Sequence, residues 1–191
     1  YIYYFMTPIQ RCVKEKNTNT NPIWIMRQAG RYLPEFRKIR VKNPDFIKLC
    51  LDENLSSKIT LQPINRFDFD AAIIFSDILM LPYGLDQEVK FEKGLGPKLG
   101  ELDLDKLENT NKDEFNRKLN PVYEAISKTS VNPILKNKDL IGFVGAPWTI
   151  LVYMINKMSP KKDLSKKIFE DKIFIKKLFV IIIKFLKIHI E

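Results

Sequence analysis

The segment MRQAGRYLPEFR, residues 26–37, is the most informative stretch of this chain. It places Arg27 and Arg31 four residues apart, which is one helical turn, so both guanidinium groups can face one ligand. A guanidinium is a planar fork of donors that binds a carboxylate through two hydrogen bonds and stays charged. Two such groups side by side predict a ligand with several carboxylates or phosphates. The alternative is a pair of unrelated surface arginines near a turn.

Two more segments stand out further along the chain. Residues 71–79 read AAIIFSDIL, where the apolar run predicts a strand buried on both faces and Asp77 stands just past its end. Residues 142–149 read GFVGAPWT, and Tyr153 follows one helical turn after Thr149. We refer to residues 26–37, 71–79 and 142–149 as the first, second and third segments.

Hydrophobic patterning predicts helices that alternate with short strands. Strands are expected at residues 23–26, 69–75, 89–92 and 140–144, with a glycine-rich turn at Gly94 and Gly96. Helices are expected to open at Asn43-Pro44 and Asn120-Pro121, to run from an Asn54 cap toward Arg66 with a disturbance at Pro63, and to begin at Trp148. This alternation predicts an α/β fold with a parallel sheet and crossover helices. Periodicity alone does not choose between an open sheet and a barrel.

Residues 173–190 are strongly apolar but interrupted by lysines. Leu178 to Ile183 is the longest charge-free run, far short of the roughly 20 residues that a membrane span needs. The lysines fall three, four or seven residues apart, which predicts an amphipathic helix packed on a core. An interfacial membrane helix is the less favoured alternative.

Composition is that of an ordinary globular chain. It is 45% hydrophobic and 29% charged, and 191 residues suffice for one domain with a substantial core. The net charge of +9 suits an anionic substrate, but most of the excess is scattered lysine, which indicates compositional bias. No basic run is interleaved with aromatic residues, so a nucleic-acid partner is not expected.

Cysteine and histidine are too sparse for metal or triad chemistry. Cys12 and Cys50 are isolated and lack metal-binding spacing, which favours a reduced, cytoplasmic compartment. His189 is the single histidine and cannot form a zinc site or a catalytic triad alone. Residues 1–5 lack the features of a signal peptide, and Met6 is expected to be the start, with residues 1–5 an upstream extension.

The three segments, in this order and at this spacing, resemble signatures of the uroporphyrinogen decarboxylase family. Similarity runs from about Met6 to the last residue. The resemblance implies a (β/α)8 TIM barrel whose active site lies at the C-terminal ends of the strands. Such a barrel needs about 250 residues. We therefore expect residues 6–191 to be an incomplete, N-terminal portion of a single barrel domain, without the later segments that carry a substrate-contacting serine and histidine in the family.

The resemblance also implies a reaction. Family members remove the four acetate carboxyls of uroporphyrinogen III, giving coproporphyrinogen III and four CO2, without a metal or other cofactor. Asp77 would accept hydrogen bonds from pyrrole N–H groups and stabilise a cationic intermediate. Arg27 and Arg31 would pair with acetate and propionate groups, and one of them would act in proton delivery. The residues expected to bind substrate are Arg27, Ala29, Arg31, Phe36, Arg40, Asp77 and Tyr153.

Each role has a structural alternative. Asp77 could instead cap a helix or pair with a lysine, and Tyr153 could be a core tyrosine. Arg40 is matched less securely, because Arg37 and Lys38 crowd the same stretch. After Tyr153, residues 156–160 read NKMSP where many family members have a glycine-rich stretch. The family further implies a cytoplasmic homodimer.

Other functions remain open at this point. The chain could be an inactive fragment or a non-catalytic, basic tetrapyrrole-binding module, which turnover of uroporphyrinogen would separate from the enzyme. A corrinoid-linked methyltransferase of the same superfamily is the third reading. Such enzymes usually need His and Cys zinc ligands, whereas this chain has one His and no suitable Cys pair.

Overall fold

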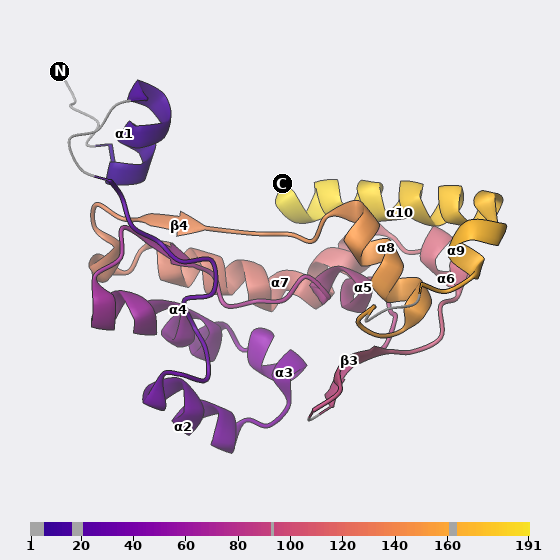
Figure 1. Ribbon diagram of the computed structural model, residues 1–191, viewed down its shortest axis with the longest axis horizontal. Coiled ribbons are helices and arrows are strands. Elements are labelled where there is room, and N and C mark those ends of the chain that lie inside the picture. Colours follow the sequence, from indigo (N-terminus) through magenta and orange to yellow (C-terminus); the bar gives the residue numbers. More distant parts are fainter. Residues whose placement is uncertain (1–5, 17–20, 93, 161–163) are drawn as a thin grey trace. The chain divides into compact units, whose positions relative to one another are not determined.

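A computed structural model describes residues 6–16, 21–92, 94–160 and 164–191 (Figure 1). The expected upstream extension, residues 1–5, lies outside the described residues. The chain divides into two compact units. Unit 1 holds Tyr1–Pro44, Lys48–Ser76 and Pro121–Phe143, and unit 2 holds Asp45–Ile47, Asp77–Asn120 and Val144–Glu191.

Unit 1 is built on a parallel pair of strands. β1 (Ala71–Ile73) pairs with β4 (Asp139–Ile141), with Ala71 opposite Asp139 and Ile73 opposite Ile141. The helices of this unit are α1 (Pro8–Glu15), α2 (Pro34–Lys42), α4 (Glu53–Phe67) and the 3-10 turn η1 (Pro133–Leu135), together with part of α3 (Phe46–Cys50) and part of α7 (Lys112–Ser130). The parallel pairing that the sequence predicts is confirmed, although each strand is only three residues long.

Helix α4 supplies the core of unit 1. One cluster joins Leu33, Phe36, Leu49 and Ile59, and another joins Leu61, Ile64, Ala72 and Leu135. Asp52, not the expected Asn54, caps the helix, because its carboxylate accepts the N–H groups of Asn54 and Leu55. Pro63 is buried within the helix, which continues to Phe67 because its packed face outweighs one lost hydrogen bond.

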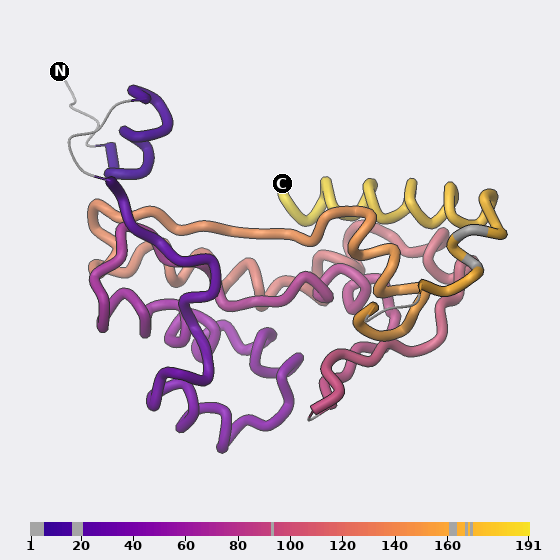
Figure 2. Tube along the Cα trace, in the orientation of Figure 1, coloured from indigo at the N-terminus to yellow at the C-terminus, as the bar shows by residue number. Residues whose placement is uncertain are grey.

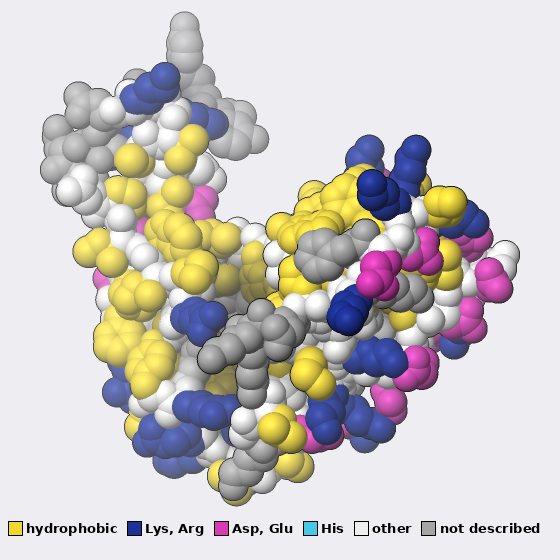
Figure 3. All heavy atoms as spheres, turned by 45° about the vertical axis from the view of Figure 1, so that its right-hand side comes forward, with side chains coloured by type: hydrophobic (Ala, Val, Ile, Leu, Met, Phe, Trp, Pro, Cys, Tyr) yellow, Lys and Arg dark blue, Asp and Glu magenta, His cyan; other side chains and the backbone are white. Residues whose placement is uncertain are grey.

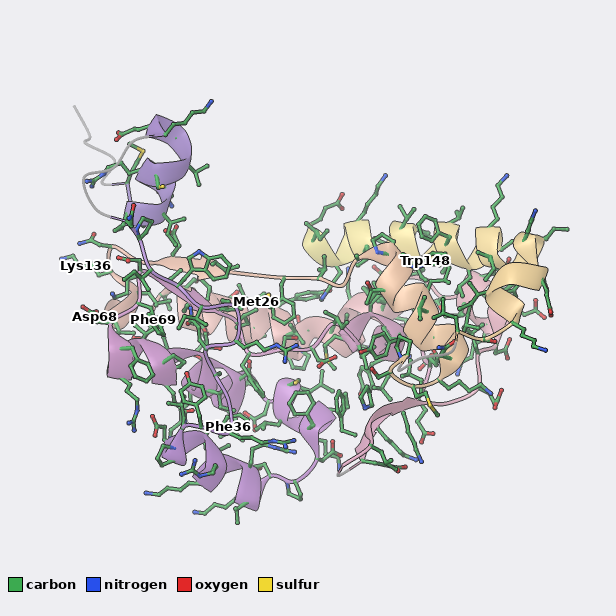
Figure 4. All side chains as sticks on the ribbon, viewed as in Figure 1. Met26, Phe36, Asp68, Phe69, Lys136 and Trp148 are labelled. Carbon is green, nitrogen blue, oxygen red and sulfur yellow. The ribbon has the colours of Figure 1, made fainter. Side chains whose placement is uncertain are left out.

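The start of β4 is held by polar contacts from two other segments of unit 1. The Thr7 hydroxyl and Nε2 of Gln10 both donate to the carboxylate of Asp139, which fastens α1 to the start of β4. After α4 the backbone turns at Asp68 with a positive φ of 53°, and Nζ of Lys138 pairs with Asp68 at 2.8 Å. Figure 4 shows Asp68, Phe69 and Lys136 together at this end.

Unit 2 is mostly helical. It contains α5 (Met80–Gly84), α6 (Leu104–Glu108), α8 (Pro147–Asn156), α9 (Lys167–Glu170) and α10 (Lys172–Ile190), with the hairpin β2 (Val89–Glu92) and β3 (Gly96–Leu99). Phe115 of α7 packs on Phe185 of α10 with ring centroids 4.8 Å apart. Gly84 lies so close to Phe115 that a Cβ there would stand 2.6 Å from the ring.

The amphipathic helix expected at residues 173–190 is confirmed as α10. It buries Leu178, Ile181, Ile182, Phe185 and Leu186 and packs against α8, α5 and α6. Its lysines are exposed, and Figure 3 shows Lys and Arg side chains beside exposed hydrophobic ones on the face that it presents. No helix in the described part of the chain is both long and apolar enough to span a membrane.

The hairpin in unit 2 confirms one expected strand and adds another. Val89–Glu92 is β2, as predicted. Gly96, which is expected in a turn, begins β3 instead. Gly94 and Gly96 have positive φ values of 82° and 89°. Such positive φ values favour glycine, which explains both residues.

Two helix predictions are wrong in their boundaries. α7 does not open at Asn120-Pro121 but begins at Lys112 and passes through Pro121. Asn111 Oδ1 accepts the Glu114 N–H at 2.7 Å, and buried Phe115 anchors the first turns, so the helix starts well before the proline. The helix expected at Asn43-Pro44 begins two residues later, at Phe46.

The strand predicted at residues 23–26 is also wrong. Ile23 to Met26 have no regular structure, and Ile23, Ile25 and Met26 are exposed. Ile23 is held by Asp70, because its N–H donates to the Asp70 carboxylate at 2.6 Å and its carbonyl accepts the Asp70 N–H at 2.9 Å. These two bonds place the segment beside the start of β1 (Figure 2).

Candidate active site

The first and second segments meet in unit 1. The Gln28 side chain donates from Nε2 to the carbonyl oxygen of Ala71 at 2.8 Å, at the first residue of β1. Phe36 of α2 packs edge-on against Phe75, with ring centroids 5.8 Å apart. The chain between Met26 and α2 is therefore fixed to β1 through a polar contact, and α2 is fixed through an aromatic contact to the residues that follow β1. Figure 4 labels Met26 and Phe36, the outer landmarks of this stretch.

The second and third segments meet in unit 2. The third segment follows directly on β4, whose last residue, Ile141, lies opposite Ile73 of β1 in unit 1. In unit 2, Gly145 lies against Ile78 and Ile150, since a Cβ built on Gly145 would be 3.1 Å from Ile78 Cβ and 2.5 Å from Ile150 Cδ1. Only a residue without a side chain allows this approach. Gly145 therefore joins the loop after Asp77 to the start of α8.

Arg27 and Arg31 are not on a helix, which corrects the helical spacing argument. Residues 26–33 form turns and bends, and α2 begins only at Pro34. The reason is Pro34, which excludes the helical region for the preceding residue, and Leu33 accordingly has φ −81° and ψ 121°. Residues 30–33 instead form a turn, in which the Leu33 N–H donates to the Gly30 carbonyl at 3.0 Å.

The side chains of Arg27 and Arg31 are both exposed to solvent. Within residues 6–16, 21–92, 94–160 and 164–191, neither guanidinium of Arg27 or Arg31 makes an ion pair or hydrogen bond. Arg66 differs, because its guanidinium holds Glu35 through two bonds of 2.9 and 3.0 Å. Two guanidinium groups four residues apart, unpaired among the described residues, keep their full hydrogen-bonding capacity for an anionic ligand.

Other expected binding residues of unit 1 have structural contacts. Nη1 of Arg40 donates to the carbonyl oxygens of Asn43 and Pro44 at 2.6 and 3.1 Å, at the end of α2. Phe36 is only 4% exposed and belongs to the core, and Ala29 packs against the same cluster. Phe36 and Ala29 thus belong to or pack against the core of unit 1, and Arg40 is bonded at the end of α2.

Asp77 lies in unit 2, half-buried before α5. Its Oδ1 accepts the Leu79 N–H at 2.8 Å, but Leu79 itself is the N-cap residue of α5, so the alternative that Asp77 caps this helix is wrong. No lysine pairs with it among the residues that the structure describes. Burial raises the pKa of the Asp77 carboxyl, because the charged form is poorly solvated, and the hydrogen bond from Leu79 opposes this shift.

Tyr153 is half-buried on α8 in unit 2. Its hydroxyl donates to Oγ of Ser159 over 3.3 Å, a long contact at the end of the helix. The structure thus places Asp77 and Tyr153 in one compact unit, and the other five expected residues (Arg27, Ala29, Arg31, Phe36 and Arg40) in the other. The described residues contain no group of three or more His, Cys, Asp or Glu side chains placed to hold a metal ion.

Sequence reasoning missed the buried glutamines. Gln28 is 3% exposed, and Gln87 is 4% exposed with Nε2 donating to the Gly100 and Met154 carbonyls, both at 3.0 Å. No periodic pattern marks a single buried amide. The position of Gln28 between two arginines of interest was the one available signal.

These features define a mixed α/β protein with a parallel strand pair in unit 1, in which the exposed Arg27 and Arg31 lie in unit 1 and the half-buried Asp77 carboxylate lies in unit 2. The sequence model of the family described as uroporphyrinogen decarboxylase (URO-D) matches residues 5–191. The chain belongs to this family.

Similar proteins carry the same name. The chain is 45% identical over 166 residues to the uroporphyrinogen decarboxylase of Rickettsia felis, covering 86% of this chain and 48% of that protein. It is 42% identical over 190 residues to the enzyme of Campylobacter jejuni, covering 96% and 54%. A third match, in Chelativorans sp., is 46% identical over 134 residues and covers 70% and 39%. The chain spans about half the length of the curated relatives it matches.

Proposed function

We propose that this protein is a uroporphyrinogen decarboxylase, which converts uroporphyrinogen III to coproporphyrinogen III by removing four acetate carboxyls as CO2. The observation that carries the proposal is the pair of exposed guanidinium groups of Arg27 and Arg31, which have no partner in the described part of the chain and lie within the family-matched segment. A substrate with eight carboxylates is the kind of ligand that two neighbouring guanidinium groups bind.

The chemical difficulty of this reaction is the electron pair that remains when CO2 leaves. Protonation of a pyrrole carbon makes the ring an electron sink and gives a cationic intermediate. The Asp77 carboxylate is poorly solvated, so its interaction with a developing positive charge is stronger than that of a carboxylate in water. Asp77 would also accept hydrogen bonds from the pyrrole N–H groups, since its Oδ2 has no partner among the described residues.

Arg27 and Arg31 would bind the acetate and propionate arms, and one of them would deliver the proton. The remaining substrate-binding residues in this proposal are Ala29, Phe36, Arg40 and Tyr153. Ala29 and Phe36 support the loop from the core side, which their burial favours. The Tyr153 hydroxyl has only a 3.3 Å contact, so a substrate carboxylate can replace it at little cost. In this proposal, side chains of the protein bind the substrate, deliver the proton and stabilise the cationic intermediate.

We further propose that residues 6–191 form part of one (β/α)8 barrel domain, with β1 and β4 among its parallel strands. The parallel register of β1 and β4 supports this placement. The curated relatives, of which the chain spans about half, leave room for further strands in the complete protein. We propose a cytoplasmic homodimer as the assembled form.

The test is turnover of uroporphyrinogen III by the protein expressed from its complete gene. The porphyrinogen is kept reduced, and products are oxidised and separated by their number of carboxylates. We expect loss of the octacarboxylate and accumulation of coproporphyrinogen. Tight binding without loss of carboxylates would instead identify a tetrapyrrole-binding module. Turnover that depends on an added corrinoid and zinc would identify a methyltransferase.

A further inference from the structure

In the arginine-bearing loop, residues 23–33, apolar side chains are exposed while a polar side chain is buried. Ile23, Ile25, Met26 and Tyr32 are between 51% and 71% exposed, whereas the polar Gln28 is 3% exposed. Apolar side chains normally fill the interior and amides the surface. A buried amide in an otherwise exposed stretch requires a specific partner.

That partner is the outer edge of β1. The Asp70 carbonyl and the Ile74 N–H both bond to the β4 side. Because the backbone groups of successive strand residues point to opposite edges, the Ala71 carbonyl points away from β4. An edge carbonyl that is shielded from water and unpaired is unfavourable. Nε2 of Gln28 donates to the Ala71 carbonyl at 2.8 Å and satisfies it.

The Gln28 backbone is held as well. The Tyr32 hydroxyl donates to the Gln28 carbonyl, which closes the loop over the residues between them. Arg27 precedes the anchored residue directly and Arg31 lies within the closed loop. Both arginines therefore extend from a backbone that is fixed to β1 at Gln28.

Stability alone does not explain this residue. Oε1 of Gln28 is buried without a hydrogen-bond partner in the described part of the chain, which is unfavourable for folding. An apolar side chain of similar volume would avoid that cost while filling the same space. The feature that an apolar side chain could not reproduce is the directed bond to Ala71.

We propose that Gln28 is a positioning residue that holds Arg27 and Arg31 in register with β1 for carboxylate binding. This inference rests on the proposed function. Gln28 acts through the loop backbone, and its amide does not contact the substrate because the side chain is closed off from solvent.

The test uses two substitutions at Gln28 in the protein expressed from its complete gene. Gln28→Leu removes the donor at every pH. In Gln28→Glu, the protonated carboxyl can donate to Ala71 but the ionised form has no donor, and burial raises the pKa of the introduced group. Gln62→Glu is the matched control, because Gln62 is also buried, at 7% exposed, but lies on α4 and has no bond to the loop.

For Gln28→Leu we expect kcat/KM to fall about tenfold or more at every pH, chiefly through KM, since misplacing binding groups by about 1 Å has effects of this size or larger. For Gln28→Glu we expect near-wild-type kcat/KM at low pH and a loss as the introduced carboxyl ionises. Gln62→Glu should keep the wild-type pH profile. Thermal unfolding run in parallel confirms that each variant is folded under the assay conditions.

Hydrogen exchange of residues 24–33 gives a second readout that does not need activity. We expect faster exchange in Gln28→Leu than in wild type or Gln62→Glu. Wild-type kcat/KM or unchanged exchange in folded Gln28→Leu would overturn the inference. Wild-type protein without turnover would mean that the proposed function has failed, and in that case the exchange result still decides whether Gln28 anchors the loop.

Discussion

Gly145 lies directly against Ile78, and a Cβ built on the glycine would stand 3.1 Å from the Cβ of Ile78. Ile78 follows Asp77 in the chain, and Gly145 precedes the helix that carries Tyr153. The close approach therefore couples the position of the carboxylate to that of the tyrosine-bearing helix. The proposed chemistry depends on this spacing as much as on the two side chains.

Gly145→Ala should disturb that packing. The added methyl would meet Ile150 Cδ1 at 2.5 Å as well as Ile78, and overpacking of this kind destabilises by about 1–3 kcal/mol. We expect a lower Tm and a lower kcat. Gly142→Ala is the control, because its Cβ would have no neighbour within 4 Å. Equal effects of the two substitutions in thermal unfolding would contradict the close contact.

Arg27→Ala and Arg31→Ala should each impair turnover. Loss of a charge-assisted hydrogen bond costs about 1.5–3 kcal/mol, or roughly tenfold to over a hundredfold in kcat/KM. Both arginines are exposed and unpaired among the described residues, so stability should change little. Arg117→Ala, at an exposed arginine of α7, is the matched control. Near-wild-type steady-state kinetics for both site variants would exclude them from substrate binding.

Asp77→Asn keeps the shape of the side chain and removes its charge. If the carboxylate stabilises a cationic intermediate, kcat should fall by about a hundredfold or more, with a much smaller change in KM. Oδ1 of the asparagine can still accept the Leu79 N–H, so the entry to α5 is preserved. Weaker substrate binding with an unchanged kcat would assign Asp77 a positioning role.

The same substitution should stabilise the protein near neutral pH. The folded pKa of Asp77 is raised, so the folded state holds this proton more tightly than the unfolded state. The contribution to stability is therefore fully present below the unfolded pKa of about 4 and is lost as the pH rises through the folded pKa. Asn does not titrate. Urea unfolding should show that Asp77→Asn gains stability over wild type at pH 7 and that the gain disappears toward pH 4. An equal difference at both pH values would mean that burial of this carboxyl is not responsible.

Much of the local structure was predictable from the sequence. The long amphipathic helix α10, the helix after Pro147 and the strand at residues 89–92 follow from periodicity and from a proline at a helix start. The parallel pairing of β1 with β4 follows from the alternation of helices with apolar runs. The helices and the strand depend on neighbours in the sequence, and the parallel pairing depends on the order of elements along the chain.

What sequence reasoning missed depends on contacts distant in the chain. Residues 23–26 have an apolar, strand-like composition, but only Ile23 pairs with the backbone and carboxylate of Asp70. Pro121 passes through the middle of α7 because buried residues on both sides hold the helix. The buried Gln28 bonds to Ala71, which is 43 residues away, and no local pattern encodes that partner.

Release of CO2 from uroporphyrinogen III tests the central claim most directly. The substrate carries an isotopic label in its acetate carboxyls, and the protein expressed from its complete gene is compared with its Asp77→Asn and Arg117→Ala variants. We predict four labelled CO2 per uroporphyrinogen consumed by the wild type and by Arg117→Ala, and a strongly reduced rate for Asp77→Asn. A folded wild-type protein that binds uroporphyrinogen but releases no labelled CO2 would contradict the account.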